Sequence, residues 1–504
     1  MGNRVASPTS DRAGRSSARW RLVIGAGTLA IALGAVVLLP GNGSRLGLKL
    51  ASGAGADAVA GPATKSSRPT VSPATARASV VSSPETPSAA ASEVTGTTGT
   101  AGTAGKKADA KIAGKAAAPK TGCKRSTSTT AKVKVTKVQL GIPVTGYGDE
   151  SDTAKLPMAM AATPSGTSWL AWQGTNSRVY LAKLDCGDHL VGKPTSFAGI
   201  DLQDVQADRT GGVLLLTRRG SCHTGPLCGG ASSPCNTMHM VRFDNSGHLV
   251  WQRQVTNLTS SRGGYDDGAR FAWWYQHHGR LAYDGTNYAA YFGVAITVQN
   301  GSCVDIHEGD RMQVVNPQGK LVSGHNSFAV GCSHAWTSRI VWDPHRKRFA
   351  MVCATDNECR IAQPNPYRTV VSGTCDGTLF GGDLVLAKSA GYWTAWSQGG
   401  TTRLSHFTTA AASKTIQTGV KAAHPHLVSY GPGRMLLAWQ SGATMRAQAY
   451  DSGTGKRVGG QLTIAVKDHD YQAFKAYADG SAAYPAAGGT STSIKIARML
   501  PLGT

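Results

Sequence analysis

The chain has 504 residues, with 52 Lys and Arg against 29 Asp and Glu, and a formal net charge of +23. Residues 1–137 hold 20 of the basic and 5 of the acidic residues, so this segment carries +15 (20 − 5) of the charge. The remaining residues carry +8 (32 − 24) and all 14 His. The charge therefore divides the chain into two physically different parts, and the second is only mildly basic.

The first 39 residues have the pattern of a membrane anchor. Residues 1–21 are polar and contain five Arg against a single Asp, and residues 22–39 are apolar and uncharged. As a helix, this apolar run would span about 27 Å, close to the hydrocarbon thickness of a bilayer. Because basic flanks stay inside, we predict a cytoplasmic segment over 1–21, a transmembrane signal-anchor over 22–39, and an extracytoplasmic remainder. A cleaved export signal and secretion are the alternative.

Residues 41–131 are Ala, Thr, Ser, Gly and Pro with scattered Lys, and residues 41–137 contain no Trp, Tyr or Phe. Such a composition buries too little apolar surface to offset chain entropy, so we predict a disordered stalk. A flexible chain of this length has an end-to-end distance of about 50–60 Å. Its cations are scattered without aromatic residues or an RNA-binding motif, and we therefore expect no nucleic-acid partner.

From residue 157 onward a pattern of short apolar strands and Gly turns recurs. Its clearest copies are 424–460, 156–192 and the segment from Asp383. Seven copies align on the end of their second strand, at Trp172, Leu216, Phe292, Val352, Trp396, Trp439 and Tyr484. Four of the six intervals are 43 to 45 residues, and the two longer ones each contain a single copy plus an insertion. A repeat of this length predicts an all-β, seven-bladed β-propeller over 132–504.

The last copy supplies only three strands, over 472–477, 481–485 and 493–499, before the chain stops. In the segment 132–138, the Val residues at 133, 135 and 138 are separated by Lys or Thr, a pattern typical of a half-buried strand. We predict that it forms the outer strand of the last blade. It would thereby join the two ends of the ring and cover an exposed sheet edge.

The run from His424 to Gly460 contains Pro, two apolar residues, a Gly turn, Leu-Leu-Ala-Trp-Gln and an Asp-x-x-Gly turn. This pattern resembles the tandem repeats of exported bacterial β-propellers of uncharacterised function and, more distantly, the WD40-like superfold. The resemblance covers roughly residues 132–504 and implies the propeller fold. It implies no activity, because propellers serve as lectins, hydrolases, scaffolds and receptors alike.

An exported chain with ten Cys is expected to hold them as disulfides. We predict the pairs Cys353–Cys359 and Cys303–Cys332, and one pair among Cys222, Cys228 and Cys235. A zinc site formed by the last three together with His223 competes with this pairing. The spacings of six and seven residues fit no standard structural zinc site, so no metal site is predicted.

Insertions at 222–237, 257–280 and 297–311 interrupt the repeat, and propellers usually carry their specific contacts in such segments. Aromatic rings beside polar groups are typical of carbohydrate sites, whereas carboxylates and His can bind a divalent cation or act as acid and base. Packing under the loop or plain solvation is the alternative for each of these side chains. The candidate ligand-binding residues are Trp273, Trp274, His277, His278, Asp305, His307, Glu308 and Asp310. His334, His424 and His426, at the starts of innermost strands, are weaker candidates.

These features predict a non-catalytic binding or scaffold propeller, displayed outside the membrane and recognising a glycan, wall polymer or protein. A polysaccharide hydrolase is the first alternative. It would pair Asp266 or Asp267 with Glu308 or Asp310, and would need two carboxyl groups about 5–10 Å apart over an open cleft. A purely structural envelope protein is the second alternative. No motif requires a cofactor, although a divalent cation stays possible.

Overall fold

A computed structural model describes residues 122–145, 158–219, 236–256, 269–272, 279–322, 338–355, 359–408, 412–469 and 472–501, with single or paired gaps at 126, 301 and 365–366. The predicted signal-anchor and all of the stalk up to residue 121 lie outside these residues. Within them the secondary structure is β-strand, and no helix is long and apolar enough to cross a membrane.

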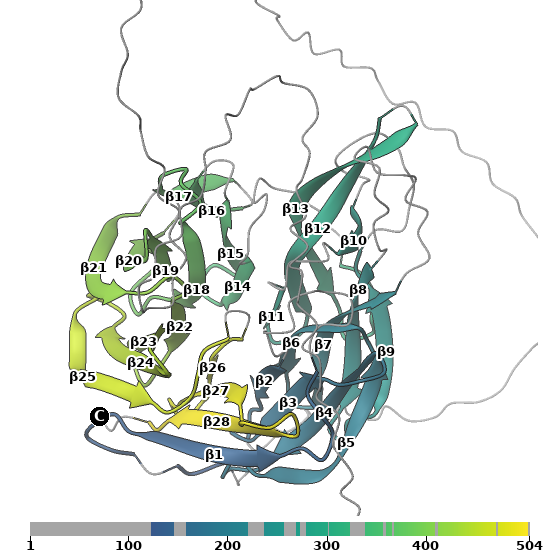
Figure 1. Ribbon diagram of the computed structural model, residues 1–504, viewed down its shortest axis with the longest axis horizontal. Helices are drawn as coiled ribbons and strands as arrows, with labels where there is room; N and C mark the ends of the chain where they lie inside the picture. The colour runs from purple at the N-terminus through teal and green to yellow at the C-terminus, as the bar shows by residue number, and fades with distance from the viewer. Residues whose placement is uncertain are drawn as a thin grey trace, which may run out of the picture. The chain divides into compact units, whose positions relative to one another are not determined.

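The described strands form seven antiparallel sheets, which are the blades of a β-propeller (Figure 1). Blade 1 comprises β2 (Met158–Ala162), β3 (Ser168–Gln173), β4 (Arg178–Leu184) and β5 (Leu190–Ala198). Blade 2 comprises β6 (Asp201–Ala207), β7 (Gly211–Arg219), β8 (Asn236–Asp244) and β9 (Leu249–Gln254). Blade 3 comprises β10 (Ala269–Ala272), β11 (Arg280–Tyr283), β12 (Tyr288–Asn300) and β13 (Cys303–Val315), with β10 and β11 both paired to β12.

Blade 4 comprises β14 (Ser338–Asp343), β15 (Arg348–Thr355), β16 (Arg360–Gln363) and β17 (Arg368–Ser372). Blade 5 comprises β18 (Phe380–Leu386), β19 (Tyr392–Gln398), β20 (Thr401–Phe407) and β21 (Lys414–Lys421). Blade 6 comprises β22 (His426–Ser429), β23 (Arg434–Ser441), β24 (Thr444–Asp451) and β25 (Arg457–Ile464). Blade 7 comprises β26 (Lys475–Ala476), β27 (Ala482–Ala487), β28 (Ser493–Met499) and β1 (Val133–Gln139).

The inner strands close a ring. Each lies against the inner strand of the next blade, in the order β2, β6, β11, β14, β18, β22, β26 and back to β2. The seven aligned residues of the repeat all lie on the second strands, β3, β7, β12, β15, β19, β23 and β27. The predicted seven-bladed propeller is therefore confirmed.

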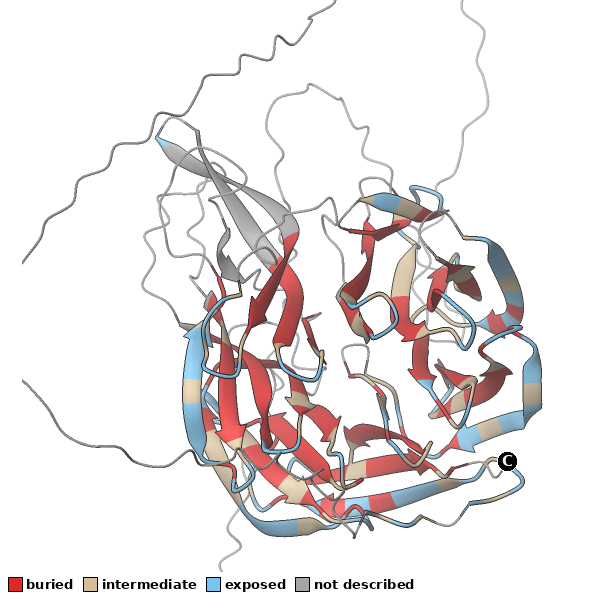
Figure 2. Cartoon of the chain, turned by 180° about the vertical axis from the view of Figure 1, so that it is seen from behind, coloured by how far each residue is buried: buried red, intermediate tan, exposed pale blue. Residues whose placement is uncertain are grey.

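The apolar core lies between the blades, and the second strands explain why. In β7, Leu214 and Leu216 pack against blade 1, whereas Val213 and Leu215 pack against blade 3. Because successive side chains of a strand point to opposite faces, a strand buried on both faces needs a continuous apolar run. The Leu-Leu-Ala-Trp pattern of the repeat meets this requirement. Figure 2 shows buried residues along the strands between the outer edge and the centre of the ring.

The Gly that precedes the second strand is the other recurring element. At Gly391 the backbone has φ of +83°, and an added Cβ would lie 2.3 Å from the carbonyl oxygen of Phe407. Only Gly tolerates both the left-handed backbone and such a close approach. The equivalent turn of blade 2 contains Gly211, whose Cβ would meet the carbonyl oxygen of Phe243 at 2.0 Å. The Gly turns of the repeat are therefore set by backbone geometry.

The ring closes as predicted. Strand β1 pairs antiparallel with β28, from Val133 opposite Met499 to Gln139 opposite Ser493. Val138 is buried in an apolar cluster shared by blades 7 and 1. The described part begins at Gly122, earlier than the predicted boundary at Lys132. The closing blade thus combines the two ends of the propeller sequence.

Candidate functional site

The blade topology gives the propeller two distinct faces. We call the face at which the inner strands begin the insertion face, and the opposite one the turn face. In an antiparallel blade, the second strand ends and the third begins at the insertion face. The breaks between β7 and β8, between β12 and β13, and before β11 and β14 all lie there. The three predicted insertions therefore leave the blades from one face, which the sequence spacing alone did not show.

The predicted binding residues are only partly described. Trp273, Trp274, His277 and His278 lie outside the described residues, as do Asp266, Asp267 and His334. Asp305, His307 and Glu308 belong to β13, where they pair with Val298, Ile296 and Ala295 of β12, but their side chains are outside the description.

Asp310 is the one predicted carboxylate whose side chain is described. It is fully buried and accepts a hydrogen bond of 2.8 Å from the Tyr291 hydroxyl. A carboxylate in this position holds β12 and β13 together and does not face an open cleft.

Charged side chains at the starts of the inner strands form two clusters near the insertion face. In the first, Lys475 of blade 7 forms an ion pair of 2.7 Å with Asp204 of blade 2. The other carboxylate oxygen of Asp204 accepts a hydrogen bond from the backbone N–H of Leu281 in blade 3. Asp204 therefore links three blades, and Lys475 reaches past blade 1 to contact it.

The second cluster centres on His426, the first residue of β22. Its Nε2 lies 2.9 Å from Asp468 Oδ1, and its Nδ1 lies 3.6 Å from Asp383 Oδ2. Asp383 also pairs with Arg339 of blade 4 and accepts a hydrogen bond from the N–H of Leu427. The Tyr484 hydroxyl donates to Asp468 at 2.6 Å. The cluster thus ties blades 4, 5, 6 and 7 together.

The electrostatics of this cluster give His426 a fixed charge. Burial alone would lower the pKa of His426, but the carboxylates of Asp468 and Asp383 outweigh it and raise this pKa to about 10. Burial raises the pKa values of Asp383 and Asp468, but nearby cations lower them further, so both lie below their usual range. The cations are Arg339 and His426 for Asp383, and His426 for Asp468. An imidazolium between two carboxylates is a structural bridge at neutral pH, because general acid–base work needs a pKa near the working pH.

The neighbouring His424 packs against the ring of Phe380, with centroids 4.4 Å apart. Across the part of the chain that the structure describes, no group of three or more His, Cys, Asp or Glu could hold a metal ion. The segment containing Cys222, His223, Cys228 and Cys235 is outside that part.

The disulfides differ from those predicted. Cys359 pairs with Cys375, not with Cys353, which forms a disulfide of its own. The prediction failed because the hairpin register places Cys353 opposite Ala362, three residues beyond Cys359. The Cys303–Cys332 pair and the pair within 222–235 involve side chains outside the described residues.

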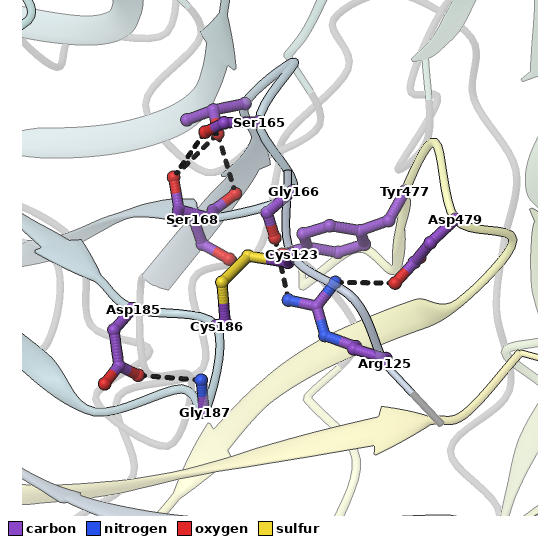
Figure 3. The surroundings of a disulfide bond; sticks show 12 residues. Cys123, Arg125, Ser165, Gly166, Ser168, Asp185, Cys186, Gly187, Tyr477 and Asp479 are labelled. Carbon is purple, nitrogen blue, oxygen red and sulfur yellow. Dashed lines mark hydrogen bonds and ion pairs between the residues drawn. A yellow bond between two sulfur atoms is a disulfide. The ribbon is translucent and has the colours of Figure 1, made fainter. Parts of the chain in front are cut away.

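A second disulfide, Cys123–Cys186, was not predicted at all. It joins the segment before β1 to the turn between β4 and β5, at the turn face (Figure 3). Beside it, Arg125 forms an ion pair of 2.8 Å with Asp479 and donates to the carbonyl of Gly166. No spacing rule pairs residues 63 positions apart, so the sequence offered no signal for this bond.

Tyr477 completes this cluster at the turn face. Its ring lies beneath the guanidinium groups of both Arg125 and Arg498, at 5.1 and 4.1 Å from the ring centroid. Its hydroxyl forms a 2.6 Å hydrogen bond with Ser168 of blade 1. Residues 122–125, before β1, are therefore fixed to blades 1 and 7 at the face opposite the insertions.

No family model and no curated protein matches the chain. Among solved structures, it is similar to the WD40 domain of Toxoplasma gondii coronin, with a TM-score of 0.45 and 10% identity over 76% of this chain and 89% of that one. The alpha-L-arabinanase of Penicillium chrysogenum gives 0.39 and 13%, over 74% and 98%. The WD40 β-propeller domain of Doa1 gives 0.38 and 14%, over 71% and 96%. These similarities concern the propeller fold alone.

Proposed function

We propose that the chain is a binding or scaffold propeller, held outside the cytoplasmic membrane on a flexible stalk. We further propose that the insertion face recognises a glycan or wall polymer. One observation carries this proposal. The insertions leave the blades at one face, and the segment from the stalk is fixed at the other by Cys123–Cys186 and Arg125–Asp479. The described N-terminal segment therefore lies at the turn face and does not cover the insertion face, where we propose that the ligand binds.

The described charges support binding more than catalysis. The carboxylates of Asp204 and Asp383 on inner strands, and of Asp468 in the connection between β25 and β26, each have a cationic partner and a buried side chain. Paired, buried carboxylates hold neighbouring blades together, whereas a glycosidase needs two accessible ones facing its substrate. Asp310, which the hydrolase alternative would use, is buried against Tyr291.

The test is a glycan array probed with the full-length chain in detergent. We expect binding to a restricted set of glycans, and loss of that binding in Trp273→Ala/Trp274→Ala. A matched control, Val191→Ala/Leu249→Ala, removes exposed apolar side chains from the outer strands of blades 1 and 2 and should bind normally. Release of new reducing ends from a bound glycan would favour the hydrolase instead. No binding to any glycan, together with none to isolated cell wall, would favour a purely structural protein.

A further inference from the structure

The outer strands of the propeller differ in charge from the rest of the blades. The six described outer strands, β1, β5, β9, β17, β21 and β25, contain no Asp or Glu. Their basic residues are Lys134, Lys137, Lys193, Arg253, Arg368, Lys414, Lys421 and Arg457. The circumference is therefore basic along these six strands, whereas β13 of blade 3 contains Asp305, Glu308 and Asp310.

The acidic side chains are used elsewhere, in the turns. Asp244, for example, accepts hydrogen bonds from the backbone N–H groups of Ser246 and His248, at 2.8 and 2.9 Å. The N–H group of His248, followed by that of Ser246, lowers the pKa of this carboxyl against the weak effect of burial. Asp185, Asp208, Asp284, Asp343, Asp376, Asp451 and Asp479 accept equivalent bonds in their own turns. These carboxylates thus lie in the turns that connect strands, and the six outer strands have no acidic residue of their own to balance their Lys and Arg.

Six of the outer cations form one continuous band, which we call the basic rim: Lys414 and Lys421 of β21, Arg457 of β25, Lys134 and Lys137 of β1, and Lys193 of β5. All six are exposed, and none forms an ion pair with a described residue. Their strands belong to four successive blades, 5, 6, 7 and 1, which follow one another along the left and lower edges of the ring in Figure 1.

Contacts between these strands show that the band is continuous. Arg457 of β25 donates to the carbonyl of Thr418 in β21, and β25 also lies against β1. Lys134 and Thr136 of β1 both donate to the carbonyl of Gly187, in the turn that leads into β5. Each outer strand along this arc therefore carries one or two exposed cations.

We propose that the basic rim binds a flexible, linear polyanion, such as a phosphate-bearing polymer, that follows the circumference of the propeller. In a ring of seven blades, the direction in which the outer strand faces changes by about 51° from one blade to the next. The outer strands of four successive blades therefore cover nearly half of the circle. A flat membrane would touch one or two of these blades at a time, and duplex DNA is too stiff to follow such a curve. A flexible chain can engage all six cations and release counterions from each contact.

This surface goes beyond the proposed function, because it is separate from the insertion face. The test measures binding of long-chain inorganic polyphosphate to the full-length chain in detergent, by calorimetry over a series of salt concentrations. The rim variant is Lys137→Gln/Lys193→Gln/Lys414→Gln/Lys421→Gln. A matched control, Arg209→Gln/Lys320→Gln/Lys388→Gln/Lys467→Gln, removes the same charge from exposed positions in turns and connections. Both variants retain the basic stalk.

We expect the rim variant to lose at least about tenfold in affinity at low salt. The slope of log K against log salt should fall by about 3, because each lost contact with a flexible polyanion is worth about 0.7. The control should lose far less, and a Lys→Arg variant of the same four rim positions should bind normally. Wild-type protein should bind tripolyphosphate weakly, since it is too short to span several blades.

Three results would overturn the proposal. Equal weakening in the rim and control variants would mean that only net charge matters. Equal affinity for tripolyphosphate and long polyphosphate would indicate a local site. Binding of the wild type to phosphatidylglycerol vesicles but not to polyphosphate would assign the rim to a membrane. Lys residues protect edge strands from pairing, so the Gln variant could aggregate. In that case the Arg variant and the comparison of long polyphosphate with tripolyphosphate still test the proposal.

Discussion

Removing the Cys123–Cys186 disulfide tests how the propeller is held closed. The bond closes a segment of 63 residues, and in the chain-entropy account such a crosslink destabilises the unfolded state by about 4 kcal/mol. The Cys359–Cys375 bond closes 16 residues and is worth about 3 kcal/mol by the same reasoning. We therefore expect Cys123→Ser/Cys186→Ser to lose about 4 kcal/mol in the free energy of unfolding, and Cys359→Ser/Cys375→Ser about 1 kcal/mol less.

The assay is equilibrium unfolding in urea, followed by Trp fluorescence, with the slope of each transition compared between variants. The Ser substitutions keep the size of each side chain close to that of Cys, so packing at Gly166 and along β16 changes little. A loss below 1 kcal/mol for the Cys123/Cys186 variant would refute the reasoning. A larger loss for the Cys359/Cys375 variant would do so as well, since the order follows from loop length alone.

Three further predictions concern the inter-blade contacts. Because the pKa of His426 is raised to about 10, its contribution to stability is complete below its unfolded pKa of about 6.5 and is lost as pH rises towards 10. The urea midpoint of the wild type should therefore fall between pH 6.5 and 10, and His426→Gln should make the midpoint less dependent on pH in this window. A wild-type midpoint that rises across the window would contradict the assignment. Val138→Ala should cost about 2 kcal/mol because its side chain is buried between blades 7 and 1, whereas Val135→Ala on the exposed face of β1 should change unfolding by less than about 0.5 kcal/mol. Tyr477→Phe should lower the free energy of unfolding by about 1 kcal/mol, because it removes the hydrogen bond to Ser168 but keeps the ring beneath both Arg side chains. An equal loss in Tyr477→Ala would show that the contacts between this ring and the two Arg contribute little.

The repeat could be read from the sequence because it reflects local physics. A residue with a left-handed backbone precedes the second strand, and it is usually Gly, as at Gly391, although blade 4 has Lys347 there. A strand buried on both faces must be apolar throughout, as 213–216 is. The Val-containing pattern of residues 132–138 was likewise sufficient to predict the closing strand, which pairs with β28. The structure differs in detail, because Thr136 and Val138 are buried and Val135 is exposed. These features depend on neighbours within a few residues or on the count of strands.

The disulfides and the charge clusters needed the tertiary structure. Cys359 bonds to Cys375 and Cys123 to Cys186 because strand register and ring closure bring them together, and neither is visible in spacing. Asp204 and Lys475 are 271 residues apart, yet the ring places them at an ion-pair distance of 2.7 Å.

The sequence by itself determined the number of blades and the closing strand, because both follow from local pattern and composition. Only the tertiary structure decided which charges are buried in pairs at His426 and Asp204 and which remain free on the rim. It also placed the insertions and the N-terminal segment 122–125 on opposite faces. Such properties arise from the circular arrangement of the blades, which joins residues that no local spacing relates.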